Sequence, residues 1–244
     1  KKSGVIRLFY NNCNGLEINN TIGTFLQQKK DKIKYNYVLD TEAPTKVDSI
    51  VRQMKLWEVD VVSLSETCVA WENKVPRRVI QQITTKYDRN SCWNMASSQI
   101  NIGGYVKPGG AGILLLGSTT GTIIDRGADP WKMGRWTYTL LKGTRHLTLL
   151  LITGYRTGNR TSSCGDKTAW SQQMTMLLKE GRSQKPHDAF IRDLRKWIRQ
   201  YRKPGMEIML NLDANEQWSD TSEIFKFARD LNLRSINEEY KISA

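Results

Sequence analysis

Short apolar runs alternate with amphipathic stretches along this chain. Residues 5–10 and 59–64 have the continuous apolar character of buried strands. Between them, from Thr45 onward, apolar residues recur every three or four positions, which predicts one helix. A strand, a helix and a second strand in this order favour an α/β fold.

The later part of the chain continues this alternation. The pattern predicts strands at 111–116, 121–124, 136–141, 147–152 and 207–212, with a hairpin turn at 142–145. It predicts helices at about 168–180, 187–203 and 221–231, a mixture of helix and loop at 72–90, and a long loop with one short helix at 17–44. Because no repeat or linker interrupts the pattern, we expect a single domain over residues 1–244.

Composition limits the class of protein. Hydrophobic residues make up 39% of the chain and charged residues 25%, as in ordinary soluble globular proteins. No apolar run approaches 18 residues, so we expect no transmembrane helix. The cysteines form no Cys-x-x-Cys pair, which argues against structural zinc and favours free thiols in a reducing, intracellular compartment.

The net charge of +13 changes this picture, because such a surplus favours a polyanionic partner, nucleic acid first. Residues 179–203 carry nine Lys and Arg against three Asp and Glu. The candidate nucleic-acid contacts in this helix are Arg192, Arg195, Lys196 and Arg199. A solvated surface helix with no anionic ligand is the alternative that the sequence leaves open.

Polar side chains follow two of the first strands where each strand ends, the position at which sheet-built enzymes place their chemistry. Glu66 can hold a hard divalent ion through oxygen. The amides of Asn12 and Asn14 can orient a phosphate or metal-bound water, and Gly15 permits a tight turn. An exposed strand-end glutamate and an ordinary Asn-Gly turn are the alternatives.

Two later strands end in the same way. Asp213 can orient or deprotonate an attacking water, and the amide of Asn215, two residues on, can fix that carboxylate or bond a phosphate. Tyr155 ends the strand at 147–153, and its hydroxyl can donate to a phosphate oxygen. Standing alone, each of these residues would be read as part of an ordinary turn or core rim.

The order of four segments is more specific than any one of them. It resembles the endonuclease/exonuclease/phosphatase superfamily of metal-dependent phosphodiesterases. The segments are Asn12-Cys13-Asn14-Gly15-Leu16, Asp60-Val61-Val62-Ser63-Leu64-Ser65-Glu66-Thr67, Gly154-Tyr155-Arg156 and Leu212-Asp213-Ala214-Asn215-Glu216. Further likeness to the endonucleases of non-LTR retrotransposons lies in Gly134-Arg135-Trp136, Tyr155-Arg156 and Thr168-Ala169-Trp170-Ser171-Gln172-Gln173.

The resemblance implies a four-layer α/β sandwich, with two mixed sheets packed face to face and helices outside. It implies Mg²⁺ or Mn²⁺ held by Glu66 with Asn14, and water oriented by Asp213. The groups that it implies for positioning the phosphate are Asn12, Tyr155 and Asn215, with Arg156 and Asn159 as further nucleic-acid contacts.

The chain departs from the family pattern at several positions. Ser65 stands where the family has Gln, Leu212 where it has Gly, and Ala214 where it has Phe. After Tyr155 the family often has Pro and then Asn; this chain has Thr157 and Gly158, with Asn159 one place late.

The family also ends on a Ser-Asp-His strand that has no counterpart before Ala244. We therefore expect that the last strands are missing, that a C-terminal polypeptide or fused reverse transcriptase completes the protein, and that residues 1–244 alone are inactive. The alternative is that the chain uses His146 or His187.

These observations together predict a DNA-nicking endonuclease of retrotransposon type, acting in the nucleus or elsewhere inside the cell. Two alternatives stay open. One is a phosphatase of the same fold, which the charge of +13 disfavours for small substrates. The other is a non-catalytic nucleic-acid-binding or assembly subunit.

Overall fold

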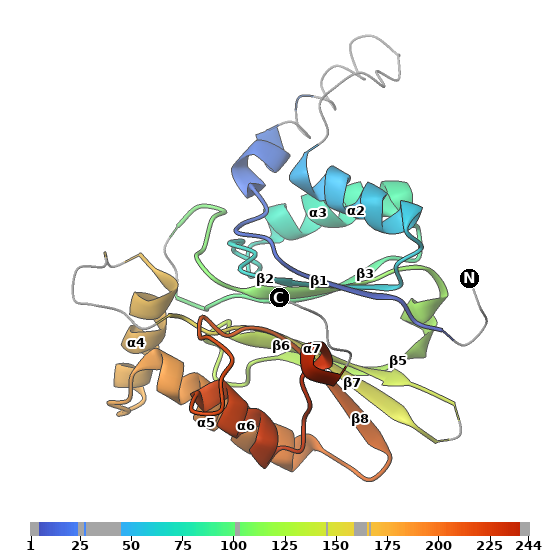
Figure 1. Ribbon diagram of the computed structural model, residues 1–244. Helices are drawn as coiled ribbons and strands as arrows, with labels where there is room; N and C mark the ends of the chain where they lie inside the picture. The colour runs from blue at the N-terminus through green and yellow to red at the C-terminus, as the bar shows by residue number, and fades with distance from the viewer. Residues whose placement is uncertain are drawn as a thin grey trace, which may run out of the picture.

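The computed structural model describes residues 5–23, 27, 45–100, 103–144, 146–158, 165 and 167–239. Two four-stranded sheets lie face to face between layers of helices (Figure 1). The strands are β1 Leu8–Asn12, β2 Val61–Ser65, β3 Cys92–Ala96, β4 Ala111–Leu115, β5 Ile123–Ala128, β6 Trp136–Lys142, β7 Thr148–Tyr155 and β8 Met206–Asp213. The helices are α2 Lys46–Leu56, α3 Lys74–Tyr87, α4 Ala169–Lys179, α5 Pro186–Tyr201, α6 Glu223–Asp230 and α7 Ile236–Glu239. This arrangement confirms the four-layer α/β sandwich.

Both sheets are mixed. The first has the order β1-β2-β4-β3, and its β1 and β2 are parallel, with α2 as the helix between them. The second has the order β5-β6-β7-β8, and its β7 and β8 are parallel. In each parallel pair, the register places the last residues of the two strands beside each other: Asn12 pairs with Ser65, and Tyr155 pairs with Asp213. The polar strand ends therefore lie next to one another within each sheet.

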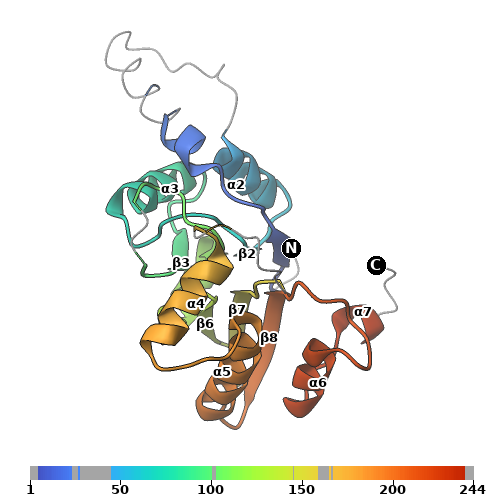
Figure 2. The ribbon, with the colours of Figure 1, turned by 90° about the vertical axis from the view of Figure 1, so that its left-hand side faces the viewer.

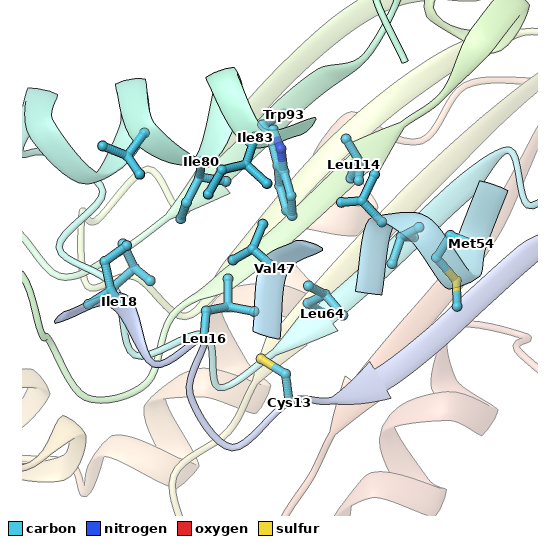
Figure 3. Close-up of a cluster of buried hydrophobic side chains, with 14 of the residues drawn as sticks. Cys13, Leu16, Ile18, Val47, Met54, Leu64, Ile80, Ile83, Trp93 and Leu114 are labelled. Carbon is cyan, nitrogen blue, oxygen red and sulfur yellow. The ribbon is translucent and has the colours of Figure 1, made fainter. Parts of the chain in front are cut away.

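Three apolar layers hold the sandwich together. Under α2 and α3, residues such as Val47, Leu64 and Trp93 form the first core (Figure 3). A second, smaller cluster that includes Val61 and Leu151 lies between the two sheets. On the outer face of the second sheet, α5 and α6 bury the third cluster, which includes Trp136, Phe190, Leu194, Ile198 and Phe227.

The helices form where the sequence spacing places them. Thr45 caps α2 by accepting a hydrogen bond from the backbone N–H of Asp48, and Val47, Val51 and Met54 are buried along one face. Apolar residues four apart in α5 face the second sheet, because positions four apart lie on one side of a helix. The amphipathic pattern thus sets which face each helix buries.

Two elements differ from the sequence prediction. The strand predicted at 121–124 begins two residues later than expected, because the 3-10 turn η1, Gly117–Thr122, covers its first half. The strand β5 then continues to Ala128 through the polar residues Asp125 and Arg126. The mixed region at 72–90 is largely the 14-residue helix α3, and the strand β3 follows it unpredicted. Both β3 and β5 are edge strands, whose partly exposed residues do not give a continuous apolar run.

A groove of about 640 Å³ runs along the outer edge of β8. Its wall includes Ile208, Leu210 and Leu212 of β8 and Phe227 of α6. Figure 2 shows α6 and α7 beside this strand. Within the described residues β8 has a paired strand on one side only, so its other edge is open. None of the described helices is long and apolar enough to cross a membrane.

A buried ion pair joins the second sheet to its helices. The guanidinium of Arg135, fully buried before β6, donates to Asp129 at 2.7 Å and to Asp193 of α5 at 2.7 Å. Burial alone would raise the pKa of Asp193, but Arg135 and Arg182 outweigh it and hold that pKa below its usual value.

We predict that Arg135→Ala costs about 3–5 kcal/mol of unfolding free energy, because it leaves buried carboxylates without their cation. Urea denaturation measures this, with the exposed Arg199→Ala as a control that changes stability by less than about 0.5 kcal/mol. A carboxyl group whose pKa is lower in the folded than in the unfolded protein stabilises the fold at pH values above its unfolded pKa, which is 3.8 for Asp193. The difference in unfolding free energy between wild type and Arg135→Ala should therefore narrow as the pH falls below 3.8. A gap that is constant with pH would contradict the assignment.

Candidate active site at the ends of four strands

Side chains from both sheets meet where β1, β2, β7 and β8 end. The amide nitrogen of Asn12 donates to Glu66 Oε2 at 3.1 Å and to Asp213 Oδ2 at 2.7 Å. Glu66 follows the first sheet's β2 and Asp213 ends the second sheet's β8, so one amide bridges carboxylates from opposite sheets. The structure therefore brings together three residues that the sequence singled out separately.

The turn after β1 positions this bridge. Asn12 Oδ1 accepts a hydrogen bond from the backbone N–H of Asn14 at 2.9 Å, which fixes which end of the amide faces the carboxylates. Gly15 donates its backbone N–H to the carbonyl of Glu66 at 2.7 Å, so the two turns are tied together. Asn14 lies exposed on the same turn.

Backbone strain is concentrated at this site. Asn14, Glu66, Cys68 and Asn215 all adopt positive φ, at +42°, +52°, +52° and +46°. Non-glycine residues held in the left-handed region cost about 1–3 kcal/mol each and cluster at functional sites. Four of them in three adjoining turns indicate that the surrounding structure imposes this geometry.

Tyr155 is oriented toward the same carboxylates. Its hydroxyl is hydrogen-bonded to Glu66, and burial, together with the charges of Glu66 and Asp213, raises its pKa. The hydroxyl therefore keeps its proton at neutral pH and remains a donor. Gly109, with φ of +81°, packs against the ring: a Cβ there would lie 3.3 Å from the Tyr155 ring, so the glycine turn at 108–110 sets where the ring lies.

The turn after β8 is braced from both sides. The backbone N–H of Asn215 donates to Asp213 Oδ1 at 3.2 Å, and the Asn215 side chain donates to the carbonyl of Arg156 at 2.7 Å. The backbone N–H of Arg156 donates to the carbonyl of Asp213 at 2.9 Å. One N–H of the Asn215 side chain is thus used to hold the turn.

Arg156 does not have the phosphate-binding position expected for it. Its side chain is buried, and it pairs with Glu216 at 2.6 Å and with Glu223 at 2.6 Å. Its Nε donates to the carbonyl of His187 at 3.1 Å. The guanidinium instead connects the end of β7 to the loop after β8 and to the N-terminus of α5 and α6. Asn159 lies outside the described residues.

The basic residues of α5 are divided between pairing and exposure. Arg192 pairs with Asp193 at 3.3 Å and Arg195 with Asp230 at 3.4 Å, whereas Lys196 and Arg199 are exposed without an ion pair among the described residues. The N-terminus of α5 lies near Arg156, so residues nine to twelve positions later lie about 14–18 Å farther along the helix.

Sequence analysis missed Tyr10. Its hydroxyl is hydrogen-bonded to Ser65 Oγ at 3.0 Å, and burial, aided by the charge of Asp213, raises its pKa to about 12. Tyr10 and Asn12 are two positions apart in one strand and so share a face. The two-residue spacing of Tyr10 and Asn12 in a predicted strand is the feature of the sequence from which the place of Tyr10 beside the site could have been inferred.

The carboxylate pair carries excess negative charge. Burial, and then the charge of Glu66, raises the pKa of Asp213, while the N–H groups of Asn215 and Asn12 partly offset this. Among the described residues no Lys or Arg forms an ion pair with Glu66 or Asp213. Two oxygen-bearing acids without a cation, beside an exposed amide, fit a hard divalent ion.

Among the described residues, a different group, made of one histidine and two acids, offers three potential metal ligands. His187, Asp188 and Glu223 have ligand atoms within 4.8 Å of one another. Glu223, however, is already paired with Arg156, and His187 Nε2 lies 2.8 Å from Asp188. The fixed positive charge of Arg156 disfavours a second cation at that place.

Neither histidine takes the water-activating position beside Asp213. His187 is held by Asp188 behind Arg156. His146 precedes β7, whereas Tyr155 ends it, so the two lie at opposite ends of an eight-residue strand. The alternative use of either histidine has no support in this geometry.

No protein-family model matches the chain, and no curated protein matches it. Several solved structures match the chain in fold. The catalytic domain of human nocturnin matches with a TM-score of 0.50 at 12% identity, over 96% of this chain and 72% of that one. A beta toxin from Staphylococcus aureus matches with a TM-score of 0.51 at 12% identity, over 95% and 73%. The endonuclease domain of TRAS1, a telomere-specific non-LTR retrotransposon, matches with a TM-score of 0.47 at 10% identity, over 93% and 71%.

The solved structures that resemble this chain are of the endonuclease/exonuclease/phosphatase type, as the four segments predicted. At these identities the likeness concerns the fold, and the assignment of an activity rests on the site itself.

We predict that the pKa of Asp213 responds to its two neighbours in opposite directions. Glu66→Gln should lower this pKa by removing a nearby negative charge, and Asn12→Ala should raise it by removing a hydrogen-bond donor. A carboxyl-carbon NMR titration without divalent ions measures both. Equal shifts of one sign would show that Asp213 does not lie in this network.

Proposed function

We propose that this chain is a divalent-metal-dependent phosphodiesterase that cuts nucleic acid, specifically a DNA-nicking endonuclease. The observation that carries the proposal is the Asn12 bridge: two carboxylates from different sheets, held by one amide, without a protein cation. A sandwich fold of the endonuclease/exonuclease/phosphatase type supports it.

In this proposal Glu66 and Asn14 hold Mg²⁺ or Mn²⁺ through carboxylate and amide oxygens. The bound ion would polarise the scissile phosphate and stabilise the leaving oxygen. Asn12 keeps the Glu66 carboxylate in one orientation by hydrogen bonding to Oε2.

The remaining residues position the phosphate and the water. Asp213 orients the attacking water, since its carboxylate is fixed by Asn12 and by the backbone of Asn215. Tyr155 keeps its proton and, once Glu66 is engaged by the ion, would turn its single O–H from Glu66 to a non-bridging phosphate oxygen, where charge develops in the transition state. Asn215 holds the turn and can donate its second N–H to the phosphate.

The choice of DNA rests on charge and on the sequence motifs. A net charge of +13 suits a polyanion and disfavours a small phosphorylated substrate. The likeness to retrotransposon endonucleases in Gly134-Arg135-Trp136 supports target-site nicking in the nucleus, with a fused reverse transcriptase as the expected companion. A non-catalytic binding subunit is the competing function, and it would bind DNA without cutting it.

We predict that, in the complete protein, Glu66→Ala and Asp213→Ala each lower the rate of plasmid nicking with Mg²⁺ or Mn²⁺ by on the order of 10²–10⁴, whereas residues 1–244 alone should not nick. Asp220→Ala is the matched control, because this exposed acid lies on the same loop after β8 and makes no contact with the site. Nicking at the wild-type rate by either site variant would overturn the assignment. DNA binding with no nicking by any form would favour the binding subunit.

We also predict that the divalent ion stabilises the fold through Glu66. A ligand that binds only the folded state adds about 2.7 kcal/mol at a concentration 100 times its Kd. Thermal unfolding with and without Mn²⁺ should therefore show a rise in Tm for wild type and Asp220→Ala, and little or none for Glu66→Ala. An equal rise in Glu66→Ala would place the ion elsewhere, with His187, Asp188 and Glu223 as the next candidates.

A further inference from the structure

A second cavity lies on the opposite side of the sandwich from the groove along β8. It has a volume of about 460 Å³ and lies beside β3 and β5, the edge strands of the two sheets. The backbone of Gly134 closes it: with φ of +71°, a Cβ there would lie 2.3 Å from the backbone nitrogen of Ser98. Only glycine allows the two loops to meet so closely.

The cavity has a surplus of positive charge. Arg77 of α3, Arg126 of β5 and Lys132 line it, and none of the three forms an ion pair with a carboxylate among the described residues. Arg126 instead contacts the thiol of Cys92. The two acids in the lining are already neutralised, because Glu72 pairs with the buried Lys107 and Asp129 with the buried Arg135. Three exposed cations are left without counter-charge.

Most of the other groups in the wall are already occupied or covered, the exposed Gln99 excepted. Ser97 donates to Glu72, and Asn94 donates to the carbonyls of Gly127 and Tyr138. The rings of Trp71 and Trp93 are buried, at 3% and 7% exposure, and offer little face for stacking. The cavity is therefore suited to a phosphate backbone, which carries charge, more than to base edges, which require free donors and acceptors.

Strand register sets the cavity's distance from the candidate active site. Ser65, which precedes Glu66, and Ala96, which lines the cavity, pair with Ala111 from opposite sides. They are thus two strand spacings apart, about 10 Å. Both β2 and β3 are antiparallel to β4, so both end on the same rim of the sheet. This separation is small enough for one nucleic-acid strand to reach both places within a few nucleotides.

We propose that this cavity, which we call the Arg77 pocket, binds the backbone of the nucleic-acid substrate within a few nucleotides of the scissile phosphate. The proposal rests on the proposed function, because the distance is counted from Glu66. Arg77, Arg126 and Lys132 neutralise phosphates there, without reading sequence. The pocket thus supplies an anion-binding surface on the active-site rim.

The test is the salt dependence of DNA binding, measured by fluorescence anisotropy in EDTA so that no cutting occurs. Arg77→Ala/Arg126→Ala/Lys132→Ala should flatten the slope of log K against log salt by about 2.7, since each neutralised phosphate contributes about 0.9. Between 50 and 200 mM salt, the variant should lose about 40-fold less affinity than wild type. Arg77→Lys/Arg126→Lys should keep the wild-type slope.

One comparison locates the effect. Arg195→Ala/Lys196→Ala/Arg199→Ala removes the same charge from α5 and should leave the slope unchanged. If the pocket variant keeps the wild-type slope on long duplexes, or if only the α5 variant flattens it, the proposal is wrong.

Hydrolysis of a small diester, bis(p-nitrophenyl) phosphate, separates this proposal from the function on which it rests. The pocket variant should hydrolyse it with Mn²⁺ at the wild-type rate, because the pocket lies about 10 Å from the chemistry, while Glu66→Ala should not. If the complete wild-type protein hydrolyses neither this diester nor plasmid DNA, the proposed function fails, and the binding result still decides whether the pocket holds DNA. A pocket variant that loses diester hydrolysis would place these residues in the active site and overturn the proposal.

Discussion

One side-chain amide holds together two carboxylates that would otherwise repel each other. Asn12 donates both of its hydrogens, one to Glu66 and one to Asp213, and its oxygen is fixed by the backbone of the next turn. Without this amide the two acids would have no shared hydrogen-bond donor. The Asn12 hydrogen bond, which lowers the pKa of Asp213, would then no longer offset the burial that raises it. The arrangement of the rim therefore depends on Asn12 more than on either acid.

The bridge also constrains how the sheets pack, because its two acceptors belong to different sheets. The apolar layer between the sheets sets their separation, and polar contacts fix their alignment: Asn211 of β8 donates to Ser63 of β2 at 3.1 Å, and Asn94 of β3 reaches the backbone of β5. Left-handed turns after β1, β2 and β8 then aim the side chains inward. Nonspecific apolar packing alone would allow the sheets to slide, and the directional hydrogen bonds prevent it.

The sequence predicts those parts of this structure that local pattern determines. Strands buried on both faces read as apolar runs, and the residues that end them could be identified as site candidates. The edge strand β3 was not predicted, and β5 was predicted only in part, because exposed positions interrupt the apolar runs in both strands. Contacts between sheets lie beyond any local signal: the bridging role of Asn12, the burial of Arg156 among acids and the proximity of Tyr10 to Asp213 all depend on tertiary packing.

The division of the carboxylates between two sheets has a consequence for the protein while it is being made. Residues up to Leu115 build the first sheet, with Asn12 and Glu66, and the second sheet, with Tyr155 and Asp213, follows it in the chain. The first half leaves the ribosome before the second is made, so a chain that ends before β7 carries only Asn12 and Glu66 of these groups. The Asn12 bridge to Asp213 can form only after β8 has been made and the two sheets have packed together.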